Sequence, residues 1–378
     1  MNTACRILSL ILLASLSPTL SCDSLSRELN APQSLGDAGR ITAVRSMALT
    51  RAAHTSTLLP DGKVLIAGGF ASGGSSVSSA EVFDLAQETF ASVGNMNVSR
   101  VGHTATLLSN GKVLIAGGYN GTYLASAELY DPAARTFSPT NAMNTARSGH
   151  VAVLLSNGKV LLAGGVGLGW TFLSSAEVYD PATNSFTATG EMLAARESHT
   201  ASLLPNGKVL ITGGHKGRRA AMTIYSSAEI YDPAVGKFSA TGDMTRIRHK
   251  HGAVSLADGR VLIVGGADHR DGRPAYTSAE IYNPATGTFT ATGDMNSPRY
   301  KLQDTVVRLS NEQVLIAGGA ARAELFDPAT NRFSYVSGDM GTSRMFATAT
   351  RLRNDQVLIT GGYDTTNNAT AQAWLFRA

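Results

Sequence analysis

The sequence predicts an all-β fold made of seven copies of one four-stranded unit. A Gly-Gly doublet ends an apolar segment seven times, at 68–69, 117–118, 164–165, 213–214, 265–266, 318–319 and 361–362. Consecutive doublets begin 43 to 53 residues apart, and no other segment interrupts the series. A fixed period of this length is typical of repeat architectures. Residues 41–378 therefore form one repeated array rather than the two or three domains that the length of 378 residues suggests.

The interval 103–140 shows the unit in full. A β-branched strand at 103–108 is followed by Asn110-Gly111, for which we expect a two-residue type I′ hairpin turn. The segment 112–118 is a buried second strand, 127–131 a third and 136–139 a short fourth. Asp131-Pro132 opens the tight turn between the last two strands. Four antiparallel strands in about 50 residues are typical of the blade of a β-propeller.

The last repeat ends at Ala378, after its third strand, and so lacks a fourth. The missing strand is expected at the other end of the chain, because residues 41–47 align with the fourth strand at 238–244. We predict that residues 41–47 complete the seventh blade. Such pairing would cover the exposed strand edge and close the ring.

The repeats resemble those of the kelch family. Kelch repeats carry the Gly-Gly doublet followed by two aromatic residues separated by six others. The pairs here are Phe83/Phe90, Tyr130/Phe137, Tyr179/Phe186, Tyr231/Phe238, Tyr282/Phe289 and Phe326/Phe333. Phenylalanine replaces the tryptophan that is usual at the second position. The resemblance covers residues 41–378 and implies a seven-bladed kelch-type β-propeller, but a fold does not define a function.

The N-terminal segment is expected to direct export. Arg6 precedes a largely apolar run of ten residues at 7–16, which is too short to span a bilayer but suited to a secretory signal. Ser21 before Cys22 resembles a bacterial lipobox, although Thr19 stands where leucine is preferred. Residues 1–22 thus predict either a lipoprotein lipidated on Cys22 or a plainly secreted protein, unless the match is accidental. Residues 23–40 are interpreted as a flexible tether, and the location as the bacterial cell envelope or the exterior.

Composition excludes several kinds of site. Cys5 and Cys22 are the two cysteines, so the propeller has no disulfide, no cysteine-based metal site and no thiol nucleophile. Charged residues make up 16% of the chain, and the net charge of +4 is too small to predict nucleic-acid binding. We expect no cofactor and no metal. His249 and His251 could share a metal ion, but the sequence supplies no third ligand.

Strand alternation separates two faces of the ring. Turns between first and second strands, and between third and fourth strands, lie on one face, which we call the turn face. The linkers between blades and the variable second-to-third-strand loops lie on the other, the loop face. These loops are 70–78, 119–125, 166–173, 215–225, 267–276, 320–322 and 363–370. Variable loops on a rigid scaffold usually carry binding, so we expect function on the loop face.

One arginine recurs in every linker of the loop face: Arg51, Arg100, Arg147, Arg196, Arg248, Arg299 and Arg344. Histidine follows three residues later in five repeats, at His54, His103, His150, His199 and His251. These residues could form a cationic ring around the channel mouth that binds an anion, because guanidinium groups suit carboxylates and phosphates. Alternatively, the arginines could pair with the recurrent glutamates Glu81, Glu128, Glu177, Glu229, Glu280 and Glu324 and tie the blades together, with the histidines as hydrogen-bonding scaffold residues.

Departures from the repeat indicate a basic sector on blades four to six. It contains the loop residues His215, Lys216, Arg218, Arg219, His269, Arg270 and Arg273 and the linkers 246–251 and 299–301. Trp170, Tyr119, Tyr276 and Tyr363 on the same face could stack against sugar rings. Candidate ligand-binding residues are the loop residues just given, the seven linker arginines, His251 and Trp170. A merely solvated basic patch is the alternative.

Two functions are compatible with these patterns. The first is a monomeric, non-enzymatic module that binds a protein or an acidic glycan through the loop face, with the membrane contacted only through a lipid anchor. The second, implied by resemblance to an exported kelch propeller, is a sialic acid-type mutarotase or another carbohydrate-active enzyme. Copper galactose oxidases share the fold but require a Tyr–Cys cofactor, which a cysteine-free propeller cannot form. An enzyme should place at the channel mouth an aspartate or glutamate that the scaffold does not use.

Overall fold

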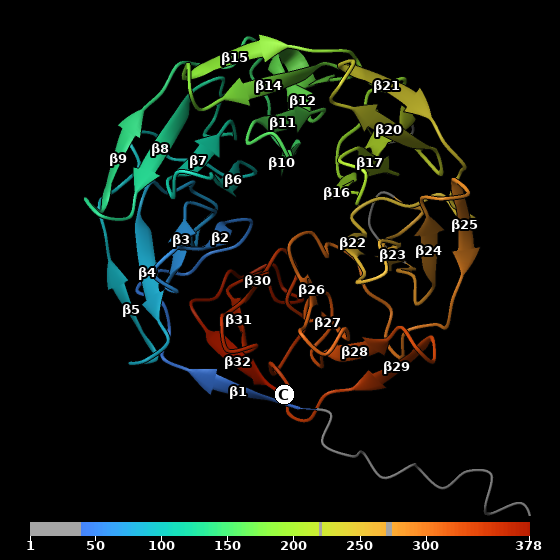
Figure 1. Ribbon diagram of the computed structural model, residues 1–378. Coiled ribbons are helices and arrows are strands. Elements are labelled where there is room, and N and C mark those ends of the chain that lie inside the picture. The colour runs from blue at the N-terminus through green and yellow to red at the C-terminus, as the bar shows by residue number, and fades with distance from the viewer. Residues whose placement is uncertain (1–38, 219–220, 270–273) are drawn as a thin grey trace, which may run out of the picture. The chain divides into compact units, whose positions relative to one another are not determined.

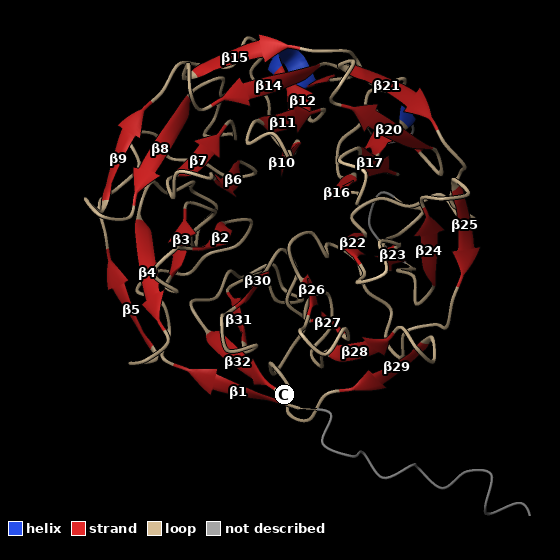
Figure 2. Cartoon of the chain, viewed as in Figure 1, coloured by secondary structure: helices blue, strands red, loops and turns tan. Residues whose placement is uncertain are grey.

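The computed structural model describes residues 39–218, 221–269 and 274–378. Within these residues, the strands form seven four-stranded antiparallel sheets arranged as a ring, which confirms the predicted seven-bladed propeller (Figure 1). Strands and loops make up almost all of the described chain (Figure 2). No helix in these parts of the chain is long and apolar enough to cross a membrane. The predicted signal at 1–22 and nearly all of the tether lie outside the described residues.

Each blade runs from the ring axis outward through four strands (Figure 1). The innermost strands are β2 (Thr55–Leu58), β6 (Thr104–Leu107), β10 (Val151–Leu154), β16 (Thr200–Leu203), β22 (Gly252–Ser255), β26 (Val306–Arg308) and β30 (Thr348–Arg351). The second strands are β3 (Val64–Ala67), β7 (Val113–Ala116), β11 (Val160–Ala163), β17 (Val209–Thr212), β23 (Val261–Val264), β27 (Val314–Ile316) and β31 (Val357–Thr360). The third strands are β4 (Ala80–Asp84), β8 (Ala127–Asp131), β14 (Ala176–Asp180), β20 (Ala228–Asp232), β24 (Ala279–Asn283), β28 (Glu324–Asp327) and β32 (Ala373–Arg377). The outermost strands are β5 (Thr89–Ser92), β9 (Thr136–Pro139), β15 (Ser185–Ala188), β21 (Lys237–Ala240), β25 (Thr288–Ala291), β29 (Arg332–Tyr335) and β1 (Arg40–Val44).

Two loops on the loop face contain short elements of their own. In blade three, β12 (Val166–Gly167) pairs with β13 (Thr171–Phe172) across the 3₁₀ turn η1 (Leu168–Trp170). In blade four, β18 (His215–Lys216) pairs with β19 (Thr223–Ile224). These hairpins extend the loops of the two blades in which the sequence places Trp170 and the first basic loop.

The hydrophobic core lies between neighbouring blades. The second strands are fully buried and, apart from Thr212 and Thr360, apolar, because sheets cover both of their faces. Leu65 and Ala67 of blade one pack with Val113, Ile115 and Tyr130 of blade two, and equivalent clusters recur around the ring. No blade can bury its apolar faces alone, so the stability of each depends on both neighbours.

Ring closure follows the prediction from the sequence, although the strand spans residues 40–44 rather than 41–47, so Arg40 belongs to the blade and not to the tether. Strand β1 pairs with β32, with Ile41 opposite Phe376, so the N-terminal segment supplies the outer strand of blade seven. Ile41 is buried in the core cluster between blades six and seven. The pairing joins residues from both ends of the described chain (Figure 1).

The predicted type I′ turn is wrong in detail. Leu108 N–H donates to the Lys112 carbonyl at 2.8 Å, so three residues, 109–111, form the loop between them. Only Gly111 of these has a left-handed backbone, with φ of 82°, which is the three-residue hairpin with a bulge rather than the two-residue turn. The Asn110 side chain accepts a hydrogen bond from Lys112 N–H at 3.1 Å and so stabilises the turn itself.

Linker arginines hold the blades together through both their side chains and their backbones. Arg100 Nη1 donates to the carbonyl of Gly117, the first glycine of its own blade's doublet, at 2.8 Å. The Arg100 carbonyl accepts a hydrogen bond from Gly69, the second glycine of the preceding blade, at 2.8 Å. A Cβ on Gly69 would lie 2.8 Å from the Ala52 carbonyl oxygen, and one on Gly68 would lie 2.7 Å from the Arg100 oxygen. The doublet is therefore glycine because neighbouring backbone approaches it this closely.

A buried ion pair completes the same junction in six blades. The pairs are Arg51–Glu81, Arg100–Glu128, Arg147–Glu177, Arg196–Glu229, Arg248–Glu280 and Arg299–Glu324, with N–O distances of 2.5 to 3.1 Å. Each glutamate also accepts hydrogen bonds from the linker backbone; Glu229, for example, accepts from the N–H groups of Leu193 and Ala194. The pair lies within one blade, and its carboxylate fastens the linker that arrives from the preceding blade.

Blade seven replaces the ion pair with an aromatic contact. Trp374 occupies the position of the glutamate, and the Arg344 guanidinium lies 5.0 Å from the centroid of the Trp374 ring. Arg344 Nη2 donates to the Met340 carbonyl and to Gln372 Oε1 at 2.9 and 2.8 Å. Arg344 is thus held in the linker by a carbonyl and an amide oxygen instead of by a glutamate carboxylate.

Replacing Glu229 with glutamine is expected to lower the free energy of unfolding by about 3 kcal/mol, because Arg196 then remains buried without its counter-charge. Urea unfolding followed by circular dichroism measures this loss. Glu191→Gln, which changes an exposed carboxylate in the linker that Glu229 binds, is the matched control and should leave the midpoint unchanged. Equal midpoints for the two variants would show that the buried pair contributes nothing.

Candidate functional site

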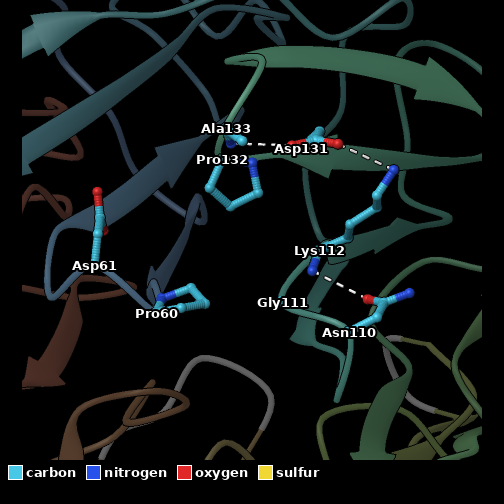
Figure 3. A pocket seen from close by; sticks show the side chains of 8 residues that line it. All are labelled: Pro60, Asp61, Asn110, Gly111, Lys112, Asp131, Pro132 and Ala133. Carbon is cyan, nitrogen blue, oxygen red and sulfur yellow. Dashed lines mark hydrogen bonds and ion pairs between the residues drawn. The ribbon is translucent and has the colours of Figure 1, made fainter.

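The turn face has a shallow pocket that belongs to the scaffold. It lies between blades one and two and is lined by Pro60, Asp61, Asn110, Gly111, Lys112, Asp131, Pro132 and Ala133 (Figure 3). Its ion pair, Lys112 Nζ to Asp131 Oδ2 at 3.0 Å, recurs in three other blades as Lys63–Asp84, Lys159–Asp180 and Lys208–Asp232. Because the lining consists of residues common to most repeats, nothing in it distinguishes a specific ligand site.

The linker arginines are not available to a ligand, which corrects one of the two interpretations of the sequence. Arg51, Arg100, Arg147, Arg196, Arg248 and Arg299 have no exposed surface, and Arg344 is 6% exposed. Their guanidinium groups donate to carbonyl, hydroxyl and carboxylate groups of the protein, so no cationic ring faces the solvent at these positions.

The recurrent histidines also belong to the scaffold. His103 Nε2 lies 3.1 Å from the Thr55 hydroxyl of the preceding blade, and His150 Nε2 lies 3.1 Å from that of Thr104. His251, which the sequence analysis placed among the ligand-binding residues, is completely buried, with Nε2 at 3.0 Å from the Thr200 and Thr212 hydroxyls. Burial lowers the pKa of His103 to about 3, so this imidazole is neutral at physiological pH and serves as a hydrogen-bonding link between blades.

An aromatic and cationic cluster occupies the loop face of blades two to four. Tyr119 and Tyr123 have ring centroids 5.2 Å apart, and Tyr123 meets Trp170 edge to face at 5.6 Å. The Arg218 guanidinium of blade four lies over the Trp170 ring of blade three. Trp170 is 49% exposed and Leu168 beside it 63% exposed, so the cluster presents apolar surface next to a positive charge.

Beside this cluster, a carboxylate and two imidazoles converge. Glu197 and His215 exchange backbone hydrogen bonds of 2.9 Å, which fixes them side by side, and His215 Nε2 lies 3.6 Å from Glu197 Oε2. His215 Nδ1 lies 3.3 Å from His249 Nδ1, and His249 Nε2 lies 3.0 Å from the His269 carbonyl. Glu197 replaces the small residues Ala52, Val101 and Ser148 of the first three blades and pairs with no linker arginine.

Burial determines the protonation of this group. It lowers the pKa of His215 to about 3 and that of His249 to about 4, with neighbouring positive charge adding to the effect. Loss of hydration raises the pKa of Glu197, while the charges of Lys250 and Arg218 oppose that change. A carboxyl with a raised pKa beside a neutral imidazole has the properties of a general acid–base pair.

The start of the innermost strands has the same backbone conformation in all seven blades. We call the residue two positions after each linker arginine the ring position; its occupants are Ala53, Gly102, Gly149, Ser198, Lys250, Lys301 and Phe346. All seven have a left-handed backbone, with φ between 50° and 64°. Hydrogen bonds join ring positions of consecutive blades at four of the seven junctions. They run from Gly149 N–H to the Gly102 carbonyl at 2.9 Å, from Lys250 N–H to that of Ser198 at 3.0 Å, from Phe346 N–H to that of Lys301 at 3.3 Å and from Ala53 N–H to that of Phe346 at 3.0 Å.

The occupants of the ring position differ in a way that the backbone does not explain. A left-handed backbone costs a residue with a Cβ about 1 kcal/mol relative to glycine, and glycine occupies the position in blades two and three. Blades five and six nevertheless carry Lys250 and Lys301, both half-buried. Burial, and next the charge of Lys250, lower the pKa of Lys301 to about 8.

Blade six departs from the repeat again just after its ring position. Leu302 and Leu309 are seven residues apart, whereas the equivalent His251 and Leu256 of blade five are five apart, so two extra residues precede β26. One of them, Asp304, has a left-handed φ of 63° and an exposed side chain. Loss of hydration beside the surrounding protein atoms raises the pKa of the Asp304 carboxyl. Asp304 and Glu197 are carboxylates near the ring axis that lie outside the arginine–glutamate scaffold.

The structure brings together part of the predicted basic sector. Lys216, Arg218 and His269 are exposed on the loop face, and His215 lies buried beneath them. Arg219, Arg270 and Arg273 lie outside the described residues. Tyr276 is buried, with the Arg246 guanidinium 5.3 Å from its ring centroid.

Three contributors were missed in the sequence: Tyr123, Glu197 and Asp304. Aligning the linkers of the seven blades would have identified two of them. Glu197 is a charged residue where the first three blades have an uncharged one, and Asp304 lies in an insertion that is specific to blade six. In the described part of the chain, no group of three His, Cys, Asp or Glu side chains is positioned to hold a metal ion.

Comparisons with known proteins agree with this architecture. Among solved structures, the chain is similar to a novel fungal alcohol oxidase of the AA5 family in complex with copper, with a TM-score of 0.72 and 16% identity over 89% of this chain and 76% of that chain. At this identity the similarity shows the fold alone. No curated protein sequence matches the chain.

A family model described as the KLHDC2/KLHL20/DRC7 Kelch-repeats domain matches residues 53–266. The match covers more than half of the 378 residues and falls on blades whose glycine doublets and paired aromatic residues the structure shows in place. The chain therefore belongs to the kelch-repeat family.

Proposed function

We propose that this chain is an exported binding module that takes an anionic protein or glycan on the loop face of blades three to six. The proposal rests on the residues of the loop face that differ from their equivalents in the other blades. Lys216, Arg218 and Arg246 are exposed there, beside the exposed Trp170 and Leu168. Kelch propellers are commonly protein-binding modules, and this family membership supports a binding role.

The chemistry of this surface favours a partner with negative charge. Arginine and tryptophan are enriched at the centres of protein interfaces, because they combine a large contact area with directed hydrogen bonds. Here Arg218 and Trp170 come from different blades and lie in contact, so a partner would cover both at once. Exposed cations around them would attract an acidic partner and increase its rate of association.

Replacing Lys216, Arg218 and Arg246 together with serine is expected to weaken binding to an acidic ligand by at least tenfold, because three charged contacts are lost. The salt concentration at which the protein elutes from immobilised heparin gives a first measure of this loss. Titration of the purified protein with heparin gives the dissociation constant. The matched control replaces Arg135, Lys237 and Arg332, three exposed cations at or beside third-to-fourth-strand turns, and removes the same net charge. Coincident elution of the two triple variants would contradict the proposed surface.

Export and lipidation form part of the same proposal, and the features of residues 1–22 support them. Lipid on Cys22 would hold the propeller at a membrane while the tether leaves the loop face accessible. A Cys22→Ser variant expressed in a bacterium is expected to move from the membrane fraction to the soluble exported fraction. Mass spectrometry of the mature N-terminus provides the direct measurement. An unprocessed Met1 terminus in the native chain would contradict export by this signal.

A second candidate function rests on Glu197. Its carboxyl has a raised pKa, lies 3.6 Å from His215 and takes no part in the arginine–glutamate scaffold. Such a pair could open a sugar-acid ring by moving a proton between the ring oxygen and the anomeric hydroxyl. The candidate is therefore a sugar-acid mutarotase or a related carbohydrate-active enzyme.

The enzymatic candidate predicts that the chain accelerates the interconversion of the anomers of N-acetylneuraminic acid, followed by proton NMR. Glu197→Gln should reduce this rate by at least a hundredfold, because the general acid–base group is lost. Glu191→Gln serves as the control, since this exposed carboxylate lies six residues earlier in the same linker and accepts a hydrogen bond from the Ser174 hydroxyl. Equal rates with and without protein would rule the candidate out and leave the binding module.

A further inference from the structure

We propose that Lys250 and Lys301 form a subsite for a phosphate group at the ring axis, on the loop face. The inference builds on the proposed function, because it takes the same face to be the binding face and names the chemistry of one ligand group. The two lysines occupy the ring position of consecutive blades, and Leu302 N–H donates to the Lys250 carbonyl at 3.2 Å. The backbones at Lys250 and Lys301 are therefore neighbours. The two extra residues of blade six come after Lys301 and so do not separate the two lysines.

The local backbone gives no reason for lysine at this position. Glycine satisfies the same left-handed conformation in blades two and three, and alanine and serine occupy it in blades one and four. Strained positions that persist against a less costly residue are concentrated at functional sites. Lysine at the ring position of two consecutive blades, where the other blades have an uncharged residue, points to a ligand that both lysines contact.

The electrostatics of the pair favour a doubly charged anion. Lys250 is near enough for its charge to lower the pKa of Lys301, so two like charges are held close together. A phosphate monoester carries close to two negative charges at neutral pH and can contact both ammonium groups at once. A carboxylate carries one charge, and the planar fork that it prefers belongs to arginine rather than to lysine.

Aromatic rings beside Lys301 suggest what carries the phosphate. Lys301 Nζ lies 5.0 Å from the ring centroids of both Tyr300 and Phe346, and Phe346 occupies the next ring position. The body of an aryl or sugar phosphate would pack against these rings while its phosphate contacts the ammonium groups. We therefore expect an organic phosphate ester to bind more tightly than the free ion.

Isothermal titration calorimetry of the full chain with phenyl phosphate, inorganic phosphate and benzoate tests the subsite. Phenyl phosphate should bind at least fivefold more tightly than either other probe, because it alone combines two charges with a ring. Equal affinity for benzoate and phenyl phosphate would overturn the assignment of a phosphate. Absence of saturable binding of both phosphates at millimolar concentration would overturn the subsite itself.

Glycine substitution separates binding from folding. Lys250→Gly and Lys301→Gly restore the residue that blades two and three carry, so the melting temperature should stay the same or rise. Each variant should nevertheless bind phenyl phosphate at least tenfold more weakly, because one ammonium contact is lost. Lys237→Gly on an outer strand is the control for loss of one exposed lysine. Wild-type affinity in both ring-position variants would overturn the proposal.

Two further measurements give responses that a purely structural role would not produce. Glu197 lies near Lys250, so Glu197→Gln should tighten phenyl phosphate binding about twofold or more by removing a nearby negative charge. Affinity should also be highest between about pH 6 and pH 8, where the phosphate is doubly charged and Lys301 is still protonated. Titratable groups near Lys250 include Glu197, His215 and His249, and Tyr300 and Asp304 lie within three residues of Lys301. Both histidines stay neutral over this range. Affinity that stays flat from pH 5 to pH 9 would contradict the role of Lys301.

These results distinguish the subsite from the proposed function. The serine triple variant at Lys216, Arg218 and Arg246 keeps both ring-position lysines, so it should lose heparin retention and keep phenyl phosphate binding. Heparin retention without any binding of phenyl phosphate would refute the subsite alone. Binding of phenyl phosphate without retention of heparin would refute the loop surface and leave the subsite supported.

Discussion

The junction between a linker arginine and two glycine doublets holds the ring together. In six blades the arginine side chain binds the first glycine of its own blade, and in all seven the arginine carbonyl accepts a hydrogen bond from the second glycine of the preceding blade. In six blades a buried glutamate balances the guanidinium and fastens the incoming linker. A buried charge is tolerated only when it is paired and hydrogen-bonded, which explains why arginine, glutamate and the doublet recur together.

This junction also divides the loop face into two kinds of residue. Positions that serve the junction are buried and saturated with internal partners, so a ligand cannot use them. The side chains of the two residues immediately after the arginine do not take part in the junction, and they differ from blade to blade. In blades four to six they include Glu197, His249, Lys250 and Lys301. Backbone hydrogen bonds across blades hold their segments together, from Lys250 N–H to the Ser198 carbonyl and from Leu302 N–H to the Lys250 carbonyl. A rigid, repeated frame thus presents a small set of unrepeated side chains.

Much of the fold was predictable from periodicity. The seven doublets, the strand boundaries of a blade and the closing strand at the N-terminus all follow from comparing repeats, because each blade solves the same packing problem. The hairpin turn was predicted incorrectly, since Asn-Gly is compatible with both a two-residue turn and a three-residue loop with a bulge. The choice depends on how the flanking residues pair, as Leu108 does with Lys112, and a dipeptide does not contain that information.

The sequence by itself determined the repeat, the number of blades and which face varies, because these depend on local patterns that recur. It left open whether the linker arginines bind a ligand or the protein, since arginine suits both roles. Only the tertiary structure decided this, by burying the guanidinium groups against glutamates about 30 residues away in the chain. The same folding placed Glu197 beside His215, and Lys250 beside Lys301, because neighbours across blades are set by the ring and not by distance along the sequence.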